Sequence, residues 1–251
     1  MLYFHKNSVK YCLALLLTLV VMLAYSQEQE DITLEFGDEV LDPWNKVDKS
    51  CGAIIVPSEA SSIVGTGFVV NNMVITASHV IKDHKTLYFS SSDALEPYLV
   101  ELVYNLPDKD IAVLKFKEKV KVTSLKLGKF EDVNMHSSVM LVGFDKFRNV
   151  LNKVATFPTV IGYGTSIEDI TDSFDFLAAK AKVLPAYSGG PIFNGNGEVI
   201  AILRSGYVTE NIRTKERGTI AIAVSIDPLR AYLESEGVMA VHNKKKSSRK
   251  R

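Results

Sequence analysis

Residues 185–193 read Pro-Ala-Tyr-Ser-Gly-Gly-Pro-Ile-Phe, and they are the most specific stretch of this sequence. Ser188 is followed by two glycines, which let backbone approach a ligand closely, and then by an apolar segment that begins at Pro191. This order predicts a hydroxyl group on a loop that leads into a buried strand. Taken alone, it also fits a glycine-rich tight turn, which is common in β proteins.

Two earlier segments carry side chains that could activate this serine. Residues 74–80 read Val-Ile-Thr-Ala-Ser-His-Val and place His79 at the end of an expected strand, where an imidazole can act as a general base. Asp110 directly precedes the apolar run 111–114, and its carboxylate could fix the imidazole tautomer. Asp108 competes for this role, but Asp110 is favoured because it abuts the run. Taken alone, His79 would more simply be a surface or core histidine, and Asp110 would more simply be a turn residue.

The rest of the chain indicates an all-β protein. With 47% hydrophobic residues and evenly spread charge, the 251 residues can bury a sizeable core. Short apolar runs separated by turn residues predict a barrel or sandwich with strands at 52–57, 63–70, 73–77, 86–91, 97–105, 111–117, 137–143, 150–157, 158–163, 175–182, 190–193, 198–204 and 217–224. One helix is predicted at 227–236, with Asp227 and Pro228 at its start and Gly237 after its end.

The three segments, taken in order, resemble the chymotrypsin-like serine proteases, and specifically their HtrA-like (Deg-type) bacterial branch. The likeness rests on Thr-Ala-Ser-His79, on Asp110-Ile-Ala-Val-Leu and on Ser188-Gly-Gly-Pro, and it covers about residues 50–236. It implies a double six-stranded β-barrel with a short C-terminal helix. It also implies a catalytic triad of His79, Asp110 and Ser188.

The resemblance extends to the residues around the triad. It implies an oxyanion hole formed by the backbone N–H groups of Ala186 and Ser188. Tyr187 would line the cleft or pack under the loop. The substrate backbone would pair as an added strand with Arg204, Ser205 and Gly206. Apolar flanking residues, with no acid at a pocket base, favour cleavage after small or medium aliphatic residues.

Three features depart from the family pattern. The family usually has glycine two residues before the nucleophile, whereas this chain has Ala186, whose methyl group restricts the oxyanion loop. Tyr187 stands where digestive relatives carry an aspartate that pairs with a newly cut N-terminus, so we expect no activation by that ion pair. The chain leaves little length after residue 236, so we expect no peptide-binding PDZ domain.

The resemblance predicts a serine endopeptidase that cleaves exported or unfolded envelope proteins through an acyl-enzyme. The alternative is a catalytically silent protease-like barrel that binds extended peptides or an envelope partner, which the altered oxyanion loop favours. We expect no cofactor and no metal, because His79 and His84 lack a third ligand nearby. Loss of Cys12 with an export signal would leave Cys51 as the single thiol, buried as a small hydrophobic side chain.

The two ends of the chain differ from its centre. Residues 1–26 have a basic start, an apolar run and small residues at a cleavage site, which predicts an export signal. An uncleaved anchor is the alternative, but the apolar run is short against the ~20 residues of a spanning helix. An acidic leader at 27–50, a peptidase domain at 51–236 and a basic tail at 237–251 follow. Within the domain, the barrels are expected at about 51–130 and 135–226.

Charge separates these parts. Eight of the 29 basic residues lie in the signal and in the last eight positions, so residues 27–243 hold 21 basic and 29 acidic residues. We expect a periplasmic or secreted protein that acts on polypeptides and does not bind nucleic acid. The basic tail is expected to be solvated, and its contact with an anionic surface is the weaker alternative.

Overall fold

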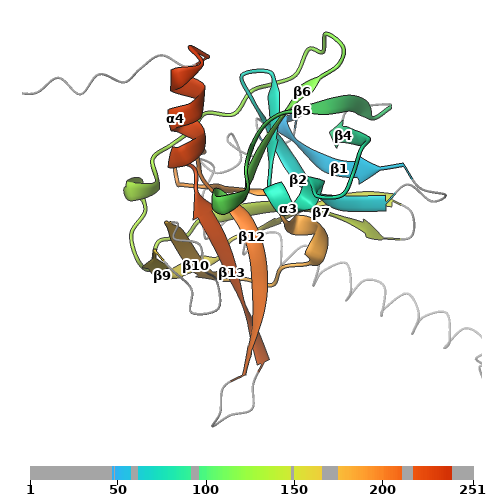
Figure 1. Cartoon of the computed structure of the whole chain (residues 1–251). Helices are drawn as coiled ribbons and strands as arrows, with labels where there is room; N and C mark the ends of the chain where they lie inside the picture. The colour runs from blue at the N-terminus through green and yellow to red at the C-terminus, as the bar shows by residue number, and fades with distance from the viewer. Residues whose placement is uncertain are drawn as a thin grey trace, which may run out of the picture. The chain divides into compact units, whose positions relative to one another are not determined.

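The computed structural model describes residues 47, 49–57, 62–91, 96–147, 150–165, 175–210 and 217–238. These residues form strands β1 to β13, the 3-10 helices η1 to η3, and helices α3 and α4 (Figure 1). The predicted signal, most of the acidic leader and nearly all of the basic tail lie outside the described residues. No helix in the described part of the chain is long and apolar enough to cross a bilayer.

The first sheet is a closed antiparallel barrel with the order β1-β2-β3-β6-β5-β4. Its strands are β1 Cys51–Val56, β2 Ser62–Val70, β3 Met73–Thr76, β4 Leu87–Ser91, β5 Tyr98–Leu106 and β6 Ile111–Phe116. Asn71 and Asn72 form the two-residue turn between β2 and β3 with φ of 47° and 62°. Positive φ at both positions is what a tight hairpin turn requires, and asparagine tolerates it.

The second sheet has the order β8-β7-β11-β12-β13-β10-β9. Strands β8 and β9 lie at the two ends of this sheet, and only Phe157 and Pro158 separate them in the chain. The predicted all-β architecture of two sheets is confirmed, with a closed barrel of six strands and a second sheet of seven strands. The strands are β7 Met140–Phe147, β8 Val150–Thr156, β9 Thr159–Gly164, β10 Phe176–Lys180, β11 Pro191–Phe193, β12 Val199–Glu210 and β13 Arg217–Ser225.

The hydrophobic core has three parts. One buried cluster lies within each barrel, and a third contains residues of both, including Phe68 of β2 and Phe144 of β7. Helix α4, Asp227–Ser235, adds Leu229 and Leu233 to this third cluster. Gly237 ends the helix with φ of 69°, the conformation in which glycine is favoured at a helix C-terminus.

The structure corrects two local predictions. His79 does not lie at the end of a strand, because β3 stops at Thr76 and His79 belongs to the short helix α3, Ser78–Ile81. The backbone N–H groups of Ser78 and His79 donate to the backbone and side-chain oxygens of Asp110, which satisfies the start of α3 from the beginning of the neighbouring strand β6. Strand β12 also extends to Glu210 instead of ending near residue 204, as a two-stranded ribbon with β13 (Figure 1).

Candidate active site

The first barrel brings His79 and Asp110 into direct contact. His79 Nδ1 lies 3.0 Å from Oδ1 and 2.9 Å from Oδ2 of Asp110. The His79 backbone N–H also donates to Asp110 Oδ1 at 3.0 Å. The carboxylate therefore holds the backbone and the ring of the histidine, and it leaves the Nε2 side of the ring for a proton acceptor or donor role. The histidine side chain is 46% exposed, whereas that of Asp110 is 6% exposed.

The position of Asp110 follows from its backbone. It ends the 3-10 helix η1, Pro107–Lys109, with φ of 54°, and its N–H donates to the Pro107 carbonyl at 3.1 Å. Aspartate is one of the few residue types that adopt this left-handed conformation at low cost. Strand β6 begins at the next residue and pairs with β3, so the ladder carries Asp110 to the end of β3 beside α3.

The second sheet supplies Ser188 on the loop before β11. The serine follows the 3-10 helix η3, Pro185–Tyr187. Its hydroxyl donates to the Arg204 carbonyl at 3.1 Å, and its N–H donates to the Pro185 carbonyl at 3.4 Å. Within the described residues, no hydrogen bond joins Ser188 Oγ to His79. The structure therefore contains the histidine–aspartate contact, while the serine hydroxyl is bonded to a backbone carbonyl.

Thr66 of β2 connects the two halves of the site, and the sequence did not single it out. The fully buried Thr66 hydroxyl donates to the Ala186 carbonyl at 2.8 Å and accepts from the Phe144 N–H at 2.9 Å. The Thr66 N–H donates to the Ser188 carbonyl at 2.8 Å. The glycines on either side of Thr66 are the feature of the sequence that could have indicated this close contact. A Cβ on Gly65 would come too close to Val80 and to the Ser188 carbonyl oxygen.

Tyr187 lies under the loop. It is 4% exposed, and a Cβ on Gly143 would overlap its ring, so the absence of a side chain at Gly143 makes room for the tyrosine. Of the two positions considered for Tyr187, the structure has the packed one. The loop therefore rests on a buried aromatic ring below and on Thr66 beside it.

Three of the four residues expected to bind substrate lie together on β12, whereas the fourth, Tyr187, is packed under the loop. Arg204 is the extra residue of a β-bulge between Leu203 and Ser205, and its Nε lies 3.8 Å from Asp110 Oδ2. Ser205 and Gly206 line a pocket of about 150 Å³ together with Ser188. The remaining residues that line this pocket are Val183, Leu184, Pro185 and Leu203.

With this geometry established, similarity to known proteins can be assessed. The family model for the trypsin-like peptidase domain matches residues 65–202. The chain belongs to this family. A probable periplasmic DegP-like serine endoprotease of Chlamydia trachomatis is 28% identical over 148 residues, which cover 58% of this chain and 29% of the relative. Serine protease HTRA1 of Xenopus tropicalis is 27% identical over 179 residues, which cover 70% and 36%.

Solved structures give the same family fold. The HtrA-type protease AlgW with a decapeptide superposes with a TM-score of 0.62 at 17% identity, covering 77% of this chain and 66% of that one. This confirms the HtrA-like fold. The chain spans about a third of the length of the curated relatives it matches.

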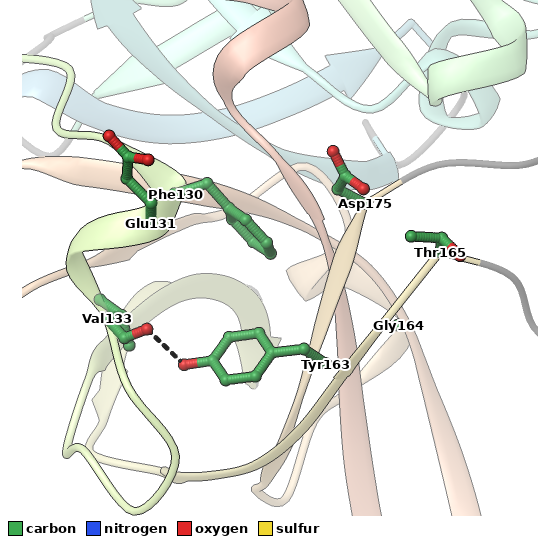
Figure 2. A pocket seen from close by; sticks show the side chains of 7 residues that line it. All are labelled: Phe130, Glu131, Val133, Tyr163, Gly164, Thr165 and Asp175. Atoms are coloured by element: carbon green, nitrogen blue, oxygen red, sulfur yellow. Dashed lines mark hydrogen bonds between the residues drawn. The ribbon is translucent and has the colours of Figure 1, made fainter.

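This trypsin-like peptidase domain has a second, larger hollow that contains none of the predicted site residues. Figure 2 shows it between η2, Phe130–Asp132, and the end of β9. Its volume is about 390 Å³. The Tyr163 hydroxyl donates to the Val133 carbonyl at 2.7 Å, and burial raises the pKa of this phenol. None of the described residues that line this hollow is a serine, cysteine or histidine, so the smaller pocket beside Ser188 is the better candidate for peptide chemistry despite its size.

Metal ligands are not gathered in the described residues. No group of three or more histidine, cysteine, aspartate or glutamate side chains there is placed to hold an ion. The nearest pairing, His79 with Asp110, has the geometry of a base and its orienting acid.

Proposed function

We propose that this protein is a serine endopeptidase in which Ser188 is the nucleophile, His79 the general base and Asp110 the orienting acid. The observation that carries the proposal is the contact of His79 Nδ1 with both carboxylate oxygens of Asp110, at the junction between the barrels where the Ser188 loop also lies. This contact fixes the ring so that its other nitrogen can take a proton.

The reaction begins with a rotation of the Ser188 side chain. Its hydroxyl leaves the Arg204 carbonyl and turns to His79 Nε2, which takes the proton as Oγ attacks the substrate carbonyl carbon. The imidazolium is stabilised by Asp110 and then donates its proton to the leaving amine, which leaves an acyl-enzyme. Water hydrolyses this ester with His79 again as the base.

The oxyanion hole would form from the N–H groups of Ala186 and Ser188. The Ser188 N–H donates to the Pro185 carbonyl in the 3-10 turn, so this donor becomes available when the Pro185–Ala186 peptide plane rotates. The rotation exchanges the carbonyl of Pro185 for the N–H of Ala186 on the side that faces Ser188. Such a rotation moves φ of Ala186 toward positive values, which an alanine adopts at a cost.

Substrate would pair with β12 at Arg204, Ser205 and Gly206. The pocket beside them is small, because Val183 packs so closely on Gly206 that a Cβ there would overlap Val183 Cγ2. This favours a small or medium aliphatic side chain before the cleaved bond, where one methylene changes specificity about 10–200-fold. The peptide in the AlgW complex and the periplasmic relatives support an exported protein that acts on unfolded envelope polypeptides.

A second function is a silent barrel that binds extended peptides. The two hydrogen bonds of Ser188 to Arg204 and Pro185 favour it, since each occupies a group that catalysis needs. The two functions share the β12 edge and differ only in whether Ser188 reacts.

Reaction of the full chain with a fluorophosphonate probe separates them. We expect the parent protein to be labelled and to degrade an unfolded protein, and Ser188→Ala to do neither. Ser235→Ala, at an exposed serine of α4, is the matched control and should behave as the parent. If the parent is not labelled and yet binds an extended peptide, the endopeptidase proposal is wrong and the silent barrel takes its place.

A further inference from the structure

Arg204 contacts both ends of the proposed triad. Its backbone carbonyl accepts the Ser188 hydroxyl at 3.1 Å, and its side-chain Nε lies 3.8 Å from Asp110 Oδ2. Pairing with a substrate backbone uses only the main chain of Arg204, so that role leaves the position of the guanidinium unexplained.

A β-bulge directs this side chain. Leu203 pairs with Ala223 and Ser205 pairs with Ile222, which leaves Arg204 as the extra residue of β12. Bulges redirect a side chain relative to its strand and are frequent beside active sites. Without the bulge, the alternation of side chains along β12 would continue through this position.

The charges of Arg204 and Asp110 are both largely shielded from solvent. The side chains are 21% and 6% exposed, so their attraction is screened less than that of a surface ion pair. Oδ2 of Asp110 is also the oxygen that lies 2.9 Å from His79 Nδ1. The same carboxylate oxygen therefore faces a permanent cation and a ring that becomes cationic only when it takes a proton.

We propose that Arg204 is a positioning residue that sets the pH range of the site, because its guanidinium partly neutralises Asp110 and so disfavours the protonated form of His79. The histidine then remains a usable base at lower pH than a carboxylate without this cation would allow. The inference rests on the proposed role of His79 as the base. It concerns the protonation of the ring, which can be measured without catalysis.

Other charges near the pair do not supply this effect. On η1, Lys109 lies 3.9 Å from Asp108, its ion-pair partner there. Lys82, Asp83 and His84 follow α3 in the chain, and β2, on which α3 packs, has no charged residue. The first four residues of β6 are apolar. Among the described residues, Arg204 is thus the cation, apart from His79, that lies within ion-pair distance of Asp110.

The test is an NMR titration of the His79 ring in the full chain carrying Ser188→Ala, assigned with His79→Gln. Arg204→Gln and Arg204→Met remove the charge, and each should raise the pH of half-protonation by about 0.5–1 unit, since a charge within ~4–6 Å has effects of this order or larger. Arg204→Lys keeps the charge and should leave the midpoint near its original value. All three substitutions leave the backbone carbonyl of residue 204 unchanged.

Activity gives a second readout. With Ser188 present, the acidic limb of the kcat/KM profile should move up in pH in the Gln and Met variants and stay in place in the Lys variant. An unchanged midpoint in both neutral variants, or an equal rise in all three, overturns the role of Arg204. Thermal unfolding identifies a variant that does not fold, and the other neutral variant then decides. If the parent has no peptidase activity, the proposed function fails, while the ring titration still decides the role of Arg204.

Discussion

The first barrel holds His79 and Asp110 in the contacts that a base and its orienting acid need, whereas the second sheet holds Ser188 in contacts that a nucleophile must leave. Asp110 bonds the ring and the backbone of His79. Ser188 instead donates its hydroxyl to Arg204 and its N–H to Pro185. In the proposed mechanism, one half of the site is assembled, and Ser188 in the other half must exchange two hydrogen bonds before it can react.

The difference follows from how each half is fixed to its sheet. Asp110 directly precedes β6, whose ladder with β3 includes the pair Thr76 and Ala112, so regular pairing places it beside α3. Ser188 lies between β10 and β11 on a loop without ladder pairing, where the bonds of the 3-10 turn decide the backbone. A ladder allows one arrangement, whereas a loop of this kind can exchange one set of local bonds for another.

Asp110→Asn breaks the assembled half and should have the largest effect. An asparagine can present its N–H to the ring and favour the wrong imidazole tautomer, so we expect kcat to fall by ~10⁴-fold. Single-turnover kinetics on an unfolded substrate measures it. Asp108→Asn on the preceding 3-10 helix is the matched control and should retain parent activity. A similar loss in both variants would show that Asp108, or the turn as a whole, has the role proposed for Asp110.

Thr66→Val removes the side-chain hydrogen bonds that join the two halves of the site. Valine has a similar shape but cannot donate to the Ala186 carbonyl or accept from the buried Phe144 N–H. Leaving buried groups unpaired costs about 1–3 kcal/mol, which lowers Tm by roughly 2–4 °C per kcal/mol in a domain of this size. Thr159→Val, at an exposed position of β9, is the control.

Hydrogen exchange then shows which half depends on Thr66. We expect faster exchange at the Ser188 and Gly189 amides in Thr66→Val and unchanged exchange at the His79 amide. Equal acceleration at the Ser188 loop and at His79 would mean that the two halves of the site unfold together. The two halves would then not differ in local stability.

Much of the assembled half was predictable from the sequence, whereas the hydrogen bonds of the Ser188 loop were not. Asp110 and the strand after it follow from an acid directly before an apolar run, and the Asn71–Asn72 turn follows from residue type. Helix α3 was missed because its first N–H groups are satisfied by Asp110, a long-range partner that no local pattern contains. Likewise, the bonds of Thr66 to Ala186 and Ser188 join residues more than a hundred positions apart.

The loop shows a second limit of sequence patterns. Residues 185–188 indicate a serine presented on a turn, and the structure has such a turn. The direction of one peptide plane decides whether the Pro185 carbonyl or the Ala186 N–H faces Ser188. Two such states differ by a few local bonds, so residue type alone does not choose between them.

Ala186→Gly should favour the conformation of the Ser188 loop that the proposed mechanism needs. If rotation of the Pro185–Ala186 plane brings residue 186 to positive φ, removal of the methyl group saves about 1–2 kcal/mol, and kcat/KM should rise about 5–30-fold. Ala178→Gly, the same substitution within β10, controls for a general loosening of the backbone. Unchanged or reduced activity in Ala186→Gly would show that the Ser188 loop is not held back at this peptide.

Glu101→Gln should have the smallest effect, because it lies on β5 outside both halves of the site. Lys117 and Lys115, at 2.8 and 2.9 Å, lower the pKa of Glu101 to about 2. A carboxyl whose folded pKa is depressed stabilises the fold above its unfolded pKa, and that contribution is lost as pH falls toward 2. The Tm difference between parent and variant should therefore be small at pH 7, shrink between about pH 4.5 and pH 2, and shrink in 1 M salt because the pair is exposed. Peptidase activity at pH 7 should not change. A loss of activity would show that a surface charge of the first barrel influences the site over a long distance, whereas we expect only the short-range contacts of the site residues to matter.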